Sequence, residues 1–162
     1  MQTRFLTPDE PTLATVAGYF RIGLMAGVCV PDEARAWALS IIGASDEPPG
    51  EIIEVSWHKP LDAMLTDLAS VKGEADVALA GNWLLVRVAE LPSASEEEVW
   101  DRLQQAMQIA RDADLPDLFD EFNGLDDELN LAVSGVYGDV VSCRERLFSI
   151  LAAFPKAPFN FR

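Results

Sequence analysis

Three features of the sequence predict an all-α fold, a compact single-domain bundle of about seven or eight helices. Apolar residues recur every three to four positions along most of the chain, the spacing of the buried side of an amphipathic helix. Proline and glycine stand between these periodic segments, and no two segments form a convincing pair of strands. With 162 residues, 49% of them hydrophobic, we expect one core over residues 1–162.

The first two helices are predicted from their start signals. Thr7 is an N-cap candidate with Pro8 at the first helical position, so a helix should run from Thr7 or Asp9 to about Ala26. Its residues are apolar nearly all round, which is typical of a central buried helix. Pro31 opens the second helix, which should end before the loop at residues 46–50.

The segment Ile52–Trp57 fits either a strand or a helix. Its β-branched residues favour a strand, but a strand has no partner elsewhere in the sequence, so we prefer a short helix. A fourth helix should follow Pro60 and stop at Gly73, and a fifth should span Asp76–Glu90.

The C-terminal half begins with the clearest helix signal, a capping box formed by Ser95 and Glu98. Residues 117–123 are expected to form a short helical turn, separate from a helix over residues 125–136. Asp139 should cap the last helix, which Pro155 ends.

The chain is strongly acidic, with 27 Asp and Glu against 12 Lys and Arg and a formal net charge of −15. Charge of this sign disfavours binding to nucleic acids and anionic membranes and attracts cationic proteins. Residues 93–128 contain twelve acids and only two bases, Arg102 and Arg111, so most of the excess charge lies in this window.

No pattern in the sequence indicates catalysis, and we expect neither enzyme activity nor a cofactor. The single histidine, His58, lies at a predicted helix boundary, and the common motifs for hydrolases, zinc peptidases and nucleotide binding are absent from the sequence. The acids after Asp112 loosely suggest a calcium loop, but Asp117 and Asn123 occupy the positions that need glycine and glutamate, so we predict no metal site.

Two cysteines and one glycine pair are interpreted as structural. Cys29 and Cys143 are far apart in sequence and are expected to be small buried thiols, although a single disulfide stays possible. Gly23 and Gly27 match GxxxG, and because Arg21 interrupts the apolar run we interpret the pair as close packing of soluble helices. The N-terminus lacks the pattern of a secretory signal, so we expect a cytoplasmic protein.

The candidate functional site is an acidic face, and its role would be to bind a basic protein partner. Acids on the outward side of the helix after Ser95, and in the segment that follows it, should share one flank of the molecule. They are Glu97, Glu98, Asp101, Asp112, Asp114, Asp117, Asp120 and Glu121. The competing interpretation is that acids at helix starts only complement the helix dipole, which explains residues 112–121 less well.

Several short motifs resemble small helical bacterial proteins among the immunity proteins of polymorphic toxin systems. They are Phe20-Arg21-Ile22-Gly23-Leu24-Met25-Ala26-Gly27, Ala36-Trp37-Ala38, the segment Pro48 to Ser56, and Gly135-Val136-Tyr137-Gly138. The resemblance spans about residues 19–154 and carries no site residues. It implies a cytoplasmic inhibitor of one cognate toxin domain, for example a nuclease whose basic cleft an acidic face fills.

The alternative is a structural or adaptor domain that self-associates, with acidity serving only solubility. Its apolar candidates are Trp83, Trp100, Phe159 and Phe161. The sequence leaves the oligomeric state and the partner's identity open.

Overall fold

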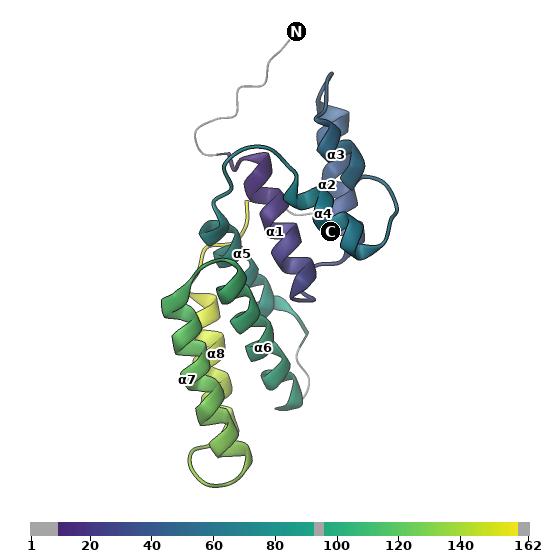
Figure 1. Ribbon diagram of the computed structural model, residues 1–162. Coiled ribbons are helices and arrows are strands. Elements are labelled where there is room, and N and C mark those ends of the chain that lie inside the picture. The colour runs from purple at the N-terminus through teal and green to yellow at the C-terminus, as the bar shows by residue number, and fades with distance from the viewer. Residues whose placement is uncertain (1–9, 93–95, 159–162) are drawn as a thin grey trace.

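The computed structural model describes residues 10–92 and 96–158, without the side chains of Glu96 and Glu97, and these residues form eight α-helices and no strand (Figure 1). The all-α prediction is therefore confirmed. The helices are α1 Leu13–Met25, α2 Pro31–Ala44, α3 Gly50–Val55, α4 Leu61–Ala69, α5 Val77–Glu90, α6 Glu96–Asp112, α7 Pro116–Val133 and α8 Val140–Ala152. None of these described helices is long and apolar enough to cross a membrane.

Helix α1 is the central helix, as its composition predicts. It packs against α2, α4, α5 and α6, and every residue from Ala14 to Leu24 except Arg21 is buried. Gly23 allows the closest of these approaches, because an added Cβ there would lie 2.4 Å from Cys29 Sγ and 2.9 Å from a Leu84 methyl group. The packing interpretation of the glycine pair thus holds for Gly23, whereas Gly27 has a φ of +73° in the turn that follows the helix.

The predicted start of this helix was wrong. The helix begins at Leu13, and Thr12 caps it by accepting a hydrogen bond from the Thr15 amide at 3.1 Å. A start at Thr7, which lies outside the described residues, would put Pro11 where the first intrahelical amide donor is needed, and proline has none.

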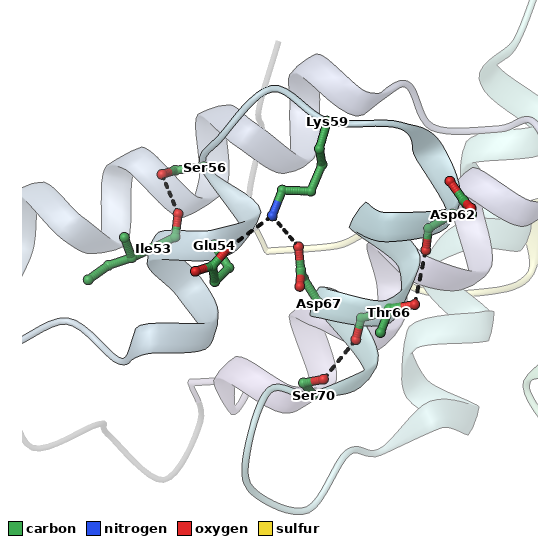
Figure 2. Close-up of polar contacts among 8 residues, drawn as sticks. All are labelled: Ile53, Glu54, Ser56, Lys59, Asp62, Thr66, Asp67 and Ser70. Atoms are coloured by element: carbon green, nitrogen blue, oxygen red, sulfur yellow. Dashed lines mark hydrogen bonds and ion pairs between the residues drawn. The ribbon is translucent and has the colours of Figure 1, made fainter.

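Helices α2, α3 and α4 form a layer beside α1 in which each contacts the next. The first four residues of the ambiguous Ile52–Trp57 segment belong to a helix, α3, with Ile52 and Val55 buried, and Ser56 and Trp57 follow its end. Figure 2 shows how Lys59 ties α3 to α4: its ammonium group lies 3.2 Å from Glu54 Oε2 and also donates to Asp67. The hydrogen bond to Asp67 is the main reason that the pKa of Lys59 is raised.

Helices α5 to α8 make a second group, a ring of four neighbours. Contacts join α5 to α6, α6 to α7, α7 to α8 and α8 back to α5, as expected for consecutive antiparallel helices with short connections. Gly81 permits the close packing of α5 on the α6–α7 connection, since an added Cβ would lie 2.4 Å from Ala113 Cβ. Side chains from both groups of helices share one buried cluster.

Helix α7 corrects the prediction of a short turn followed by a separate helix. It runs unbroken from Pro116 to Val133 through Gly124. A glycine inside a helix costs only about 1 kcal/mol relative to alanine. The buried stripe of Phe122, Leu125 and Leu129 continues across it, so packing outweighs that cost.

Candidate functional site

The acidic residues predicted as a binding face lie on α6, on the α6–α7 connection and on the first turns of α7. Four exposed members gather around the start of α7: Asp114, Asp117, Asp120 and Glu121. Asp101 is also exposed, but it lies eleven positions before Asp112 on α6, a separation of about 16 Å along the helix. The side chain of Glu97 lies outside the described residues.

The α6 side of the predicted face is less open than its helical spacing suggests. Asp112 is only 18% exposed in its side chain, and Glu98 is half-buried. The C-terminal end of α1 covers part of this surface, where Gln108 Nε2 donates to the Met25 carbonyl at 3.1 Å. The outward face expected on α6 is therefore reduced chiefly to Asp101, and most of the exposed acids lie on or next to α7.

Asp114 has a structural role in addition to its charge. It follows α6 with a φ of +54°, the only positive φ of a non-glycine residue in the described part of the chain. The Leu115 amide donates to the Ala110 carbonyl at 2.8 Å, which closes the left-handed turn that usually ends in glycine. Asp114 thus helps to set the angle between α6 and α7.

Exposed acids recur along α7 outside its buried stripe, and we call them the outer stripe. They are Asp117, Asp120 and Glu121 before Gly124, and Asp127 and Glu128 after it. The macrodipole accounts for Asp117 in the first turn, but not for acids in the middle of the helix.

Bases from the chain leave most of this charge uncompensated. Among the described residues, Glu128 pairs with Arg146 at 2.6 Å, and the charge of Glu121 also acts on this guanidinium. Asp101, Asp114, Asp117, Asp120 and Asp127 form no ion pair within the described part of the chain. Arg102 is occupied by Gln105 and the Pro92 carbonyl, and Arg111 lies 3.7 Å from the adjacent Asp112. The exposed acids are therefore available to charges outside the molecule.

An apolar surface at the end of the α7–α8 hairpin was not predicted as a site. Leu131, Val133, Val136, Tyr137 and Val141 are 42%, 66%, 72%, 77% and 56% exposed. We call these five residues the hairpin tip, which lies at the lower end of Figure 1, away from α1 to α4. Their exposure depends on how far the hairpin extends past its neighbours, which the sequence pattern does not reveal.

A second group of ionisable residues is buried where α1, α2 and α5 meet. The guanidinium of Arg87 binds the carboxylate of Glu33 through both terminal nitrogens, one of them at 2.5 Å, and donates to the Tyr19 hydroxyl at 3.2 Å. Burial raises the pKa of Cys29 to about 12 and that of Tyr19 to about 12. A thiol with so high a pKa is a poor nucleophile, so this cluster is structural.

The described residues also hold no group of three or more His, Cys, Asp or Glu side chains arranged to bind a metal ion. His58 is exposed in the connection between α3 and α4. The two cysteines are buried and free, so they do not form the disulfide that the sequence left possible.

Comparison with known proteins gives no match: no family model, no curated protein and no solved structure is similar to this chain.

Proposed function

We propose that this protein binds a basic protein domain through the acids on and beside α7, and that it acts as a cytoplasmic immunity protein that neutralises a toxin domain. The observation that carries the proposal is the group of exposed acids from Asp114 to Asp120, which form no ion pair with described residues. Like charges held together repel one another, and capture of a cationic partner offsets that cost. The toxin-inhibitor form of the proposal rests on the motif resemblance.

The alternative is that the protein self-associates and that its acidity serves only solubility. The tryptophans expected to form its apolar contact surface do not support it. Trp83 is 5% exposed in the core and Trp100 is half-buried, so neither offers an open surface. Phe159 and Phe161 lie outside the described residues. Two chains of charge −15 would also repel each other.

The test is to look for a neighbouring reading frame that encodes a basic domain, and to measure whether a domain found there forms a complex with this protein, by calorimetry and by protection of cells that express it. Asp117→Asn, Asp120→Asn and Glu121→Gln together should weaken binding about ten-fold or more. A matched control neutralises three exposed acids elsewhere, Asp46→Asn, Glu47→Gln and Asp62→Asn, and should change binding much less. If both triple variants weaken binding equally, the α7 acids are not the binding site.

A further inference from the structure

The hairpin tip is the largest gathering of exposed apolar side chains among the described residues. The described part of the chain has ten exposed large hydrophobic residues, and five of them belong to the turn between α7 and α8 and the helix ends that flank it. The other five are spread over the end of α1, the start and middle of α2, the α3–α4 connection and the start of α4. Exposed apolar residues are ordinary when single, but a contiguous group marks an interaction surface.

The local backbone explains only part of this group. Gly135, with a φ of +74°, ends α7, and the Val136 amide donates to the Leu131 carbonyl at 3.0 Å. This helix-ending motif commonly places an apolar pair at the positions of Leu131 and Val136. It requires nothing apolar at Val133, Tyr137 or Val141, each of which is more than half exposed.

The charge around the tip indicates what can cover it. Residues 126–146 contain five acids and two bases, Arg144 and Arg146, and the second of these is paired with Glu128. Leu131 also continues the line of the outer stripe, about 21 Å along α7 from Asp117. Leu131, at the α7 side of the tip, therefore lies next to the line of the acids.

We propose that the hairpin tip is the apolar centre of the partner interface, and that its occupant is a basic protein segment with apolar side chains between lysines and arginines. This inference rests on the proposed function and adds the part of the surface that holds the complex together. Aromatic side chains that become buried on binding commonly dominate interface energetics, and Tyr137, which is 77% exposed, is the aromatic residue of the tip. The outer stripe attracts the partner, and the tip then slows its dissociation.

A second copy of this chain is a poorer occupant. Pairing two tips would bring the acids beside each of them together, at a cost from like-charge repulsion. We therefore expect the free protein to be monomeric at micromolar concentrations in sedimentation. A dimer that the tip substitutions dissociate would overturn the assignment of a basic partner to this surface.

The binding test uses two peptide probes of equal positive charge, an amphipathic leucine–lysine helix and an oligolysine. The tip variant carries Val133→Ser, Tyr137→Ser and Val141→Ser, all at exposed positions where folding does not depend on burial. The matched control carries Leu39→Ser, Trp57→Ser and Leu61→Ser, which are exposed on α2, the α3–α4 connection and α4. Circular dichroism checks that both variants keep their helices.

We expect the wild type and the control variant to bind the leucine–lysine peptide more tightly than oligolysine. The tip variant should bind the leucine–lysine peptide about ten-fold or more weakly than the wild type does. Hydrogen exchange should show protection at residues 131–141 with the leucine–lysine peptide. Equal affinity of the tip variant and the wild type would overturn the role of the tip while leaving the acidic surface in place. Failure of both peptides to bind the wild type at low salt would overturn the proposed basic partner itself.

Discussion

At the scale of single residues, burial controls the chemistry of the cluster where α1, α2 and α5 meet. Tyr19 and Cys29 are each 4% exposed, and desolvation raises both pKa values from their ordinary 10.0 and 9.0 to about 12. Burial by itself lowers the pKa of Arg87, but hydrogen bonds to Glu33 and Tyr19 raise it above its usual value, so this group keeps its charge.

These shifts predict that the protein loses stability in alkali. The folded state holds the Cys29 and Tyr19 protons more tightly than the unfolded state, so these two groups leave the free energy of unfolding unchanged below about pH 9 and lower it as pH rises towards 12. Urea unfolding between pH 8 and 11 measures this decline. In Cys29→Ala the decline that begins near pH 9 should disappear. Above pH 9 the free energies of unfolding of this variant and the wild type should diverge by about 1.4 kcal/mol per pH unit. Stability that stays constant to pH 11 in the wild type would contradict the buried cluster.

The structural role of Asp114 was not predicted from the sequence. Its place among other acids suggested a binding role, but its positive φ shows that it also closes the turn after α6. No sequence signal separated these roles, because glycine or asparagine is the usual residue at such a turn.

Replacing Asp114 should therefore affect stability according to the backbone, not the charge. Asp114→Gly is expected to raise the free energy of unfolding by about 0.5–1 kcal/mol, since glycine adopts a positive φ without strain. Asp114→Ala removes the same charge but keeps a Cβ, and should bring no such gain. Denaturant unfolding of both variants makes the comparison, and equal stabilities would show that the turn is not strained.

At the scale of helices, local signals predicted most elements because their caps lie in the sequence. Asp139 caps α8 as predicted, by accepting a hydrogen bond from the Ser142 amide at 2.9 Å. Asp76, predicted as the first residue of the fifth helix, caps α5 by accepting from the Leu79 amide at 3.0 Å. Pro31 begins α2 as expected.

Two predictions were wrong for different reasons. The start of α1 overlooked the missing amide of Pro11, whereas the break in α7 gave Gly124 more weight than the buried stripe that continues across it.

The glycines of α7 and α5 provide a matched test of helix packing. Gly124→Ala should stabilise the protein by about 0.5–1 kcal/mol, because an added Cβ meets nothing within 4 Å and alanine favours the helix. Gly81→Ala should instead destabilise it by about 1–3 kcal/mol, because its Cβ would overlap Ala113. Thermal unfolding of the two variants measures both effects. A gain at Gly81, or a loss at Gly124, would contradict the positions of α5 and α7.

At the scale of the whole molecule, the sequence predicted where acids concentrate but not which of them are exposed. Met25 lies 83 positions before Gln108, and the contact between them partly covers the α6 side of the expected face. The exposure of the hairpin tip has the same origin, since it depends on where α7 and α8 extend past α5 and α6. Such long-range contacts leave no periodic pattern in the sequence.

If the acids on and beside α7 attract a basic partner, salt must slow the encounter. Stopped flow measures the association rate constant with the amphipathic leucine–lysine peptide over a series of salt concentrations. We expect fast association that slows steeply with salt, and a much shallower salt dependence in the variant with Asp117→Asn, Asp120→Asn and Glu121→Gln. A salt dependence that is the same in the wild type and in this variant would contradict that attraction.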